Sequence, residues 1–387
     1  MKTHTDTAYI NPQLLTWAIE RSGFSRKLIE KSTKLSEDQL FQLETGAVQP
    51  SFSKALKLAE TLRIPFGYFY LSEPPKLEIP LPDFRSRSSV LDYSPSPDLL
   101  DVLFNVMNQH EWFREYAIEQ RQPKVEFVGR FTVNDGVRAV ATDIQTTIGV
   151  ANGNRARASS WSDYLRLLVR SSEENGILVL RSGVVGNSTR RKLSTDEFQG
   201  FAISDDLAPL IFINAADFET AKIFTLVHEL AHLWIGKTGI SRAQEVEIPD
   251  DIPLVEKFCN SVAAEALVPE EEFLQLWHSG REYENVQKLA RYFYVSSLVI
   301  LRRAKELNLL DYGGFLQLLE IARNNLKPKT KGSGGNFFVT LESRNSPTLV
   351  NALVRETRRG TTTYREAANL LNMKVNSFAR FVEEQGR

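Results

Sequence analysis

The sequence predicts a multidomain α+β protein with an all-α N-terminal module, a larger mixed domain and a small basic α/β C-terminal unit. Three observations support this fold class. The 387 residues exceed the usual size of one domain. Two segments rich in Pro and Ser or in Gly and Lys interrupt the amphipathic patterns. Helical and strand-like periodicities occur together mainly in the middle piece. The predicted boundaries are a module at 1–75, a linker at 76–97, a domain at 98–325, a linker at 326–336 and a unit at 337–387.

Composition and charge exclude several classes of protein. Hydrophobic residues make up 42% and charged residues 25%, which is typical of a globular chain rather than a disordered or fibrous one. There is no apolar run of about 18 residues and no signal-peptide core, so no membrane segment is predicted. A single cysteine, Cys259, cannot form an internal disulfide, and we expect a cytoplasmic protein. Residues 326–387 carry 11 Lys and Arg against 5 Asp and Glu, a net charge of +6 in a chain of −1.

The N-terminal module is predicted to contain five short helices. Helix-start signals precede each of them: Pro12, Ser25, Ser36 before Glu37–Glu44, Pro50-Ser51, and Phe66 at the start of a last segment through Leu71. The fourth helix carries the apolar residues Leu56, Ala59 and Leu62.

Two helices joined by a tight turn, followed by an exit from Gly46 to Pro50, resemble the helix-turn-helix of Xre/Cro-type DNA-binding domains. The resemblance implies that Gln39 and Gln42 approach base edges while Lys27 and Lys31 hold the phosphate backbone. The third helix itself carries three acidic residues and no Lys or Arg, whereas phosphate contacts supply most DNA affinity. A helical bundle that binds a protein or forms a dimer is the alternative.

A helix predicted around residues 223–236 carries the clearest chemical motif. Its apolar positions recur at helical spacing: Ile223, Val227, Leu230 and Trp234. His228 and His232 are one turn apart, so their imidazoles point the same way and can fill two corners of a tetrahedral zinc site. Glu229 lies beside them and can take a proton from an attacking water. The alternative is a pair of surface or hydrogen-bonded histidines without a metal.

A second helix, predicted over residues 255–269 and ended by Pro269, offers a third ligand. Glu256 and Asn260 share one face, so the carboxylate can bind zinc while the amide orients a ligand histidine. Glu265 is the rival carboxylate. Cys259 lies off that face and is expected to pack as a small apolar residue.

The motif His-Glu-Leu-Ala-His at 228–232, preceded by Phe-Thr-Leu and followed by Glu-x-x-x-Asn and Ala-Ala-Glu-Ala-Leu-Val-Pro, resembles the ImmA/IrrE-type metallopeptidases. These are zinc proteases of the gluzincin kind, and the resemblance spans about residues 98–325. It implies that His228, His232 and Glu256 bind Zn²⁺ and that Glu229 is the general base. It also implies a protein substrate, typically a repressor whose cleavage controls transcription. Some relatives resemble antitoxin-side regulators, so a DNA-binding regulator or antitoxin with a structural or silent zinc site is the alternative.

Other parts of the same domain leave alternatives open. Residues 209–214 are predicted to form a short strand, which could pair with an extended substrate through its edge or lie inside the sheet. Three tyrosines are candidates for stabilising the oxyanion, and the sequence does not separate them: Tyr283, Tyr292 and Tyr294.

The C-terminal unit is predicted to contain a strand at 336–341, a helix at 347–358, a helix after Thr363, a break at 372–374 and a last helix through Phe378 and Phe381. It fits a second helix-turn-helix or, equally, a packing domain whose basic face meets the acidic remainder of the chain. The basic residues of the unit are Arg355, Arg358, Arg359, Arg365, Lys374 and Arg380. The further partners expected from the sequence are DNA, through the N-terminal module, and a second copy of the chain in a dimer.

Overall fold

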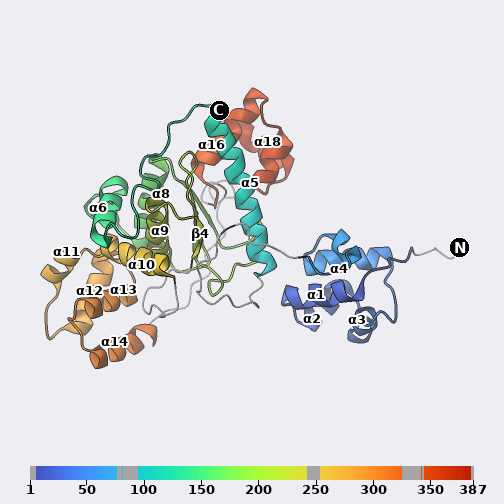
Figure 1. Cartoon of the computed structure of the whole chain (residues 1–387), viewed down its shortest axis with the longest axis horizontal. Coiled ribbons are helices and arrows are strands. Elements are labelled where there is room, and N and C mark those ends of the chain that lie inside the picture. The colour runs from blue at the N-terminus through green and yellow to red at the C-terminus, as the bar shows by residue number, and fades with distance from the viewer. Residues whose placement is uncertain are drawn as a thin grey trace. The chain divides into compact units, whose positions relative to one another are not determined.

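The computed structural model describes residues 6–75, 81, 95–241, 253–324, 341 and 344–384 (Figure 1). They form two compact units. The first contains 6–75 and 95–103, and the second contains residue 81 and the described residues from 104 onward. The predicted linkers lie largely outside the described residues. So does the predicted strand at 336–341, except for Leu341, which is helical rather than extended. Among the described helices, none is both long and apolar enough to cross a bilayer.

The first unit contains the five helical segments that the sequence predicts. They are α1 (Pro12–Ser22), α2 (Arg26–Thr33), α3 (Glu37–Glu44), α4 (Phe52–Leu62) and the 3₁₀ helix η1 (Phe66–Tyr70). Ser36 caps α3, because its Oγ accepts a hydrogen bond from the Gln39 amide while Gln39 Oε1 accepts one from the Ser36 amide. Leu56 of α4 is 41% exposed. The inward face of α4 is one step round the helix, at Ala55, Leu58, Ala59 and Leu62.

A small mixed sheet organises the second unit. Its strands, β1 (Leu178–Ser182), β2 (Gly200–Ile203), β3 (Leu210–Asn214) and β4 (Gly239–Ser241), lie in the order β1-β3-β2-β4. The β1–β3 pair is parallel, whereas β2 is antiparallel to both β3 and β4, with Gly200 opposite Ile213 and Ser241. The predicted strand at 209–214 is therefore an interior strand. Its proposed pairing with a substrate is wrong, because both of its edges are already hydrogen-bonded within the sheet.

Helix α9 (Glu219–Trp234) packs against this sheet, and every residue from Lys222 to Trp234 is buried. Such a helix belongs to the interior of a domain. The surrounding helices are α6 (Val137–Ile148), α7 (Asn152–Arg157), α8 (Trp161–Glu174), α10 (Leu254–Leu267), α11 (Glu270–Leu276), α12 (Glu282–Phe293), α13 (Ser297–Glu306) and α14 (Tyr312–Asn324). One apolar core joins most of them to α9 and the sheet.

The C-terminal helices α16 (Pro347–Arg359), α17 (Tyr364–Leu370) and α18 (Val375–Glu384) have the predicted positions, with Gly360 and Thr363 as caps. Figure 1 shows them beside α5 (Pro97–Glu119). Gln109 of α5 donates to Asn345 Oδ1 and to the Leu370 carbonyl, at 3.1 and 2.7 Å. Half-buried Glu173 accepts hydrogen bonds from Ser346 Oγ and from the amides of Thr348 and Val179. These helices thus pack on the same unit as the sheet.

Candidate metal centre

Helix α9 places His228, Glu229 and His232 in the interior, with no exposed surface on any of them. Its C-terminal end is anchored by Trp234, whose ring stacks on Phe127 with centroids 4.1 Å apart and whose Nε1 donates to Asp143 at 2.7 Å. A helix held in this way keeps its side chains in fixed rotamers. The two imidazoles are therefore presented to one point from one rigid element.

Helix α10 brings Glu256 to the same point. Its Oε1 lies 2.9 Å from His232 Nε2, its Oε2 lies 3.2 Å from His228 Nε2, and the two Nε2 atoms are 3.1 Å apart. Ligands bonded tetrahedrally at about 2.0 Å would be separated by about 3.3 Å. The three side chains thus already have nearly the spacing of zinc ligands, and one donor atom of each lies within 4.8 Å of the others.

The donor set also fits a cation chemically. Glu256 is only 2% exposed, and neither of its oxygens accepts a hydrogen bond from the described residues. Two neutral imidazoles cannot both present lone pairs to a carboxylate without a proton or a metal between them. Burial raises the pKa of Glu256, but the nearby imidazoles of His228 and His232 outweigh it and lower the pKa to about 2. An ionised, buried carboxylate facing two nitrogens is a suitable site for Zn²⁺.

Glu229 lies next to this cluster but is turned toward the sheet. Ser241 Oγ of β4 donates a hydrogen bond to Glu229 Oε1, while Oε2 is buried and has no partner in the described part of the chain. Burial raises the pKa of Glu229 to about 8, with Glu256 reinforcing it and His232 and the Ser241 hydrogen bond opposing it. One oxygen is thus held and the other remains available to accept a proton.

Sequence reasoning missed two residues that hold Glu229. Besides Ser241, the opposing strand β2 contributes Gly200, where an added Cβ would lie 2.7 Å from Glu229 Oε1 and 3.0 Å from the Phe212 carbonyl. Only a residue without a side chain fits there. Neither residue belongs to a local motif, because both reach Glu229 through the pairing of β2 with β4.

The other candidate residues of α10 have different surroundings. Asn260 is fully buried one turn from Glu256. Glu265, the rival ligand, instead forms an ion pair with Arg303 of α13. Cys259 is a buried free thiol within the apolar core, and burial raises its pKa well above the ordinary value.

None of the three candidate tyrosines has a contact with the metal centre among the described residues. Tyr294 donates its hydroxyl proton to the Ala158 carbonyl and Tyr292 donates to Glu272, each at 2.7 Å. Tyr283 is 49% exposed. The first two hydroxyls are thus committed to structural contacts, and the structure gives no support for an oxyanion role.

The predicted DNA-contacting residues all lie on the surface of the first unit. Lys27 and Lys31 are on α2, and Gln39 and Gln42 are on α3. Gln39 Oε1 is occupied by its capping hydrogen bond at the start of α3. Surface exposure permits DNA contact but does not test it, so this remains a prediction.

Comparisons with known proteins identify two parts of the second unit. Residues 345–384, which contain α16 to α18, match a family model described as a domain of unknown function, DUF8813. No curated protein matches the chain. Neither of the two family matches covers the N-terminal helices. Residues 173–305, from the end of α8 to α13, match the Peptidase_M78 model, described as an IrrE N-terminal-like domain, and this match supports a metallopeptidase of the ImmA/IrrE type.

Proposed function

We propose that this chain is a zinc-dependent endopeptidase that cleaves a regulatory protein of the repressor type and thereby controls transcription. The observation that carries the proposal is the buried convergence of His228, His232 and Glu256 beside a carboxylate with one oxygen available. The match of this segment to a metallopeptidase family supports the same reaction class.

In this proposal His228, His232 and Glu256 hold Zn²⁺, and Asn260 orients one of the ligand histidines. When bound, zinc supplies Lewis acidity, which lowers the pKa of water to about 7 and polarises a carbonyl. Glu229 accepts the proton of the attacking water at Oε2 and transfers it to the departing amine. Ser241 and Gly200 keep the carboxylate in place during both transfers.

The substrate backbone would pair with β4. This strand is at the end of the described sheet order, and its Ser241 reaches Glu229 directly. An extended peptide added to this edge would form main-chain hydrogen bonds next to the proposed base. This replaces the interior strand β3 as the docking edge.

The deciding experiment compares the wild type with Glu229→Gln. Both proteins should bind about one zinc per chain, because Glu229 is not a ligand, whereas cleavage should fall by about 10²–10⁴-fold. The readout is the set of new protein N-termini in cells that express each form. Identical sets of termini with equal zinc contents would refute peptidase function.

The second candidate is a DNA-binding regulator or antitoxin with a structural or silent zinc site. The five N-terminal helices and the Ser36 cap of α3 favour it, since they agree with the spacing of the resemblance to Xre/Cro-type domains. Under this alternative Glu229→Gln regulates normally, while the double variant Gln39→Ala/Gln42→Ala loses regulation and operator binding. Under the peptidase proposal the Glu229 variant loses regulation.

A further inference from the structure

A second cavity, distinct from the metal centre, is lined by basic side chains. It has a volume of about 490 Å³, within the size range of small-molecule sites. Its charged lining residues in the described chain are all cationic: Arg181, Lys192, Lys222 and Arg344. Small residues, among them Gly183 and Ala216, complete the lining. The metal centre does not account for this concentration of positive charge.

The cavity lies where two parallel strands end. Arg181 is near the end of β1, and Ala215 and Ala216 directly follow β3, which runs parallel to β1. Ligands bind preferentially at the carboxyl ends of parallel strands, because the loops diverge there. Gly183 lets the two loops meet, since a Cβ at this position would lie 2.8 Å from the Ala216 amide nitrogen. Lys222 is on α9, about 9 Å along the helix from His228 by helical rise.

The cations come from elements that are held in place. The loop carrying Lys192 is closed by a bridge between Val184 and Lys192 and by a 3.0 Å hydrogen bond from the Leu193 amide to the Gly183 carbonyl. Arg344 precedes the C-terminal helices and donates to Asn187 Oδ1 at 3.0 Å. The cavity is thus shared by the sheet, α9 and the start of the C-terminal unit.

Few carboxylates balance these cations. Lys222 pairs with Glu219 at 2.5 Å, and the carboxylates of Glu219 and Glu173 both attract Arg181. The Nε of Arg181 is buried and has no hydrogen-bond acceptor among the described residues. Burial lowers the pKa of Arg181 and of Arg344, and both residues are half-buried. Half-buried guanidinium groups that line a cavity are suited to a multivalent anion.

We propose that this cavity binds a small phosphate-bearing molecule, with Arg181, Lys192 and Arg344 contacting the phosphate. A phosphate offers several acceptor oxygens and up to two charges, which match several converging cations better than one carboxylate does. The cavity is larger than a free phosphate requires, and its small apolar residues leave room for an organic body. Lys222 contributes mainly long-range attraction, because Glu219 neutralises it.

The test is titration calorimetry of the full-length protein at about 0.15 M ionic strength, where surface charges are screened beyond about 8 Å. The probes are inorganic phosphate, pyrophosphate and AMP, with citrate as a multivalent carboxylate. We expect saturable binding of pyrophosphate or AMP, and Arg344→Gln and Arg181→Gln should each weaken it by about 10-fold or more. Lys192→Gln should weaken it by several-fold.

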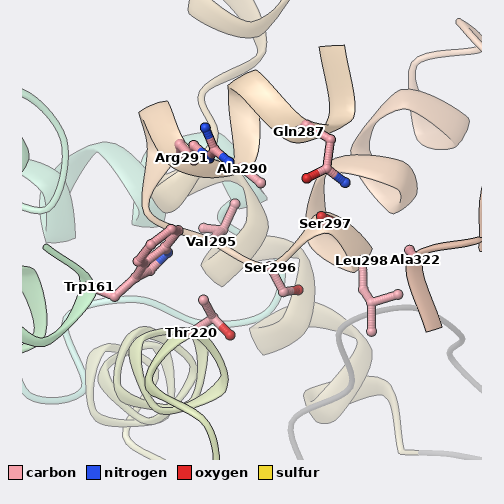
Figure 2. Close-up of a pocket in the computed structure, with 10 residues that line it drawn as sticks. All are labelled: Trp161, Thr220, Gln287, Ala290, Arg291, Val295, Ser296, Ser297, Leu298 and Ala322. Atoms are coloured by element: carbon pink, nitrogen blue, oxygen red, sulfur yellow. The ribbon is translucent and has the colours of Figure 1, made fainter. Parts of the chain in front are cut away.

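Two matched control variants each remove a positive charge that does not line the basic cavity. Arg190→Gln acts on the same loop as Lys192 but outside the lining, and both are exposed. Arg291→Gln removes a cation from a different cavity, which has a volume of about 280 Å³. Figure 2 shows this cavity, in which Thr220 and Gln287 lie on opposite sides and Arg291 is the charged residue among those drawn. Both controls should change phosphate affinity by less than about 2-fold.

Several results would overturn the proposal. One is the absence of saturable phosphate binding below about 10 mM. Others are citrate binding as tightly as pyrophosphate, or equal losses in the control variants. Binding of inorganic phosphate as tightly as AMP would assign the cavity to the free anion rather than to an organic phosphate. If Arg181→Gln fails to fold by circular dichroism, Arg344→Gln and Lys192→Gln decide, and unchanged affinity in both refutes the site.

Discussion

The two ends of α10 carry glutamates in opposite situations, one buried and one half-buried. Glu256, near the start of the helix, faces two imidazoles, and its side chain is 3% exposed. Glu265, near the end, is 12% exposed and pairs with the guanidinium of Arg303. Arg303 carries a fixed positive charge and cannot bind a metal ion, whereas imidazole nitrogens are common metal ligands. A buried carboxylate therefore indicates a metal site when its neighbours are histidine nitrogens rather than a guanidinium.

Zinc content gives the largest expected difference between the two glutamates. Glu256→Gln should reduce zinc affinity by at least about 100-fold, because it removes one of three protein ligands. Glu265→Gln should keep about one zinc per chain. Elemental analysis after dialysis against a weak chelator provides the measurement. If Glu265→Gln loses zinc while Glu256→Gln retains it, the ligand assignment is reversed.

A third carboxylate, the buried Glu229, extends the comparison to the pH dependence of the free energy of unfolding. In metal-free protein its pKa of about 8 exceeds the ordinary 4.5, so the folded state holds a proton that the unfolded state has lost. The stabilisation is complete below about pH 4.5 and is lost as pH rises through 8, by up to about 1.4 kcal/mol per pH unit. Glu229→Gln should remove this slope in urea unfolding at pH 5 to 9. An unchanged slope would show that Glu229 is ionised when folded.

The ion pair at the other end of α10 should matter for stability alone. Glu265→Gln leaves Arg303 buried and should cost about 3 kcal/mol of unfolding free energy. Glu306, whose Oε2 lies 3.6 Å from Arg303 Nη1, can take over part of the pairing. Glu271→Gln is the matched control, because this carboxylate is 81% exposed and pairs with Arg138 on the surface. The control should change stability by less than about 1 kcal/mol, and an equal loss in both would contradict the comparison.

Gly200→Ala should have the smallest effect on stability, about 1–3 kcal/mol, while disturbing Glu229. The added methyl group meets both a carboxylate oxygen and the backbone of β3, so the strand or the side chain must move. Zinc content should be unchanged and cleavage should fall. Gly153→Ala is a suitable control, since nothing lies within 4 Å of its added Cβ. Unaltered cleavage in Gly200→Ala would show that Glu229 tolerates displacement.

Local sequence patterns alone determined where the short helices lie and which residues share a helix face. Capping residues such as Ser36 and Thr363 and terminators such as Gly360 placed the short helices, because caps satisfy backbone groups within a few residues. Helical periodicity put His228 and His232 on one face and put Glu256 and Glu265 on opposite faces of their helix. It could not decide which of those faces meets α9.

Only the tertiary structure decided the contacts between distant segments. The order β1-β3-β2-β4 made residues 210–214 an interior strand and brought Gly200 and Ser241 to Glu229. The basic cavity gathers residues from position 181 to position 344, in a chain whose overall charge is only −1. The physical reason is that strand order and helix docking depend on the packing of the whole core, whereas caps and periodicity depend on neighbouring residues.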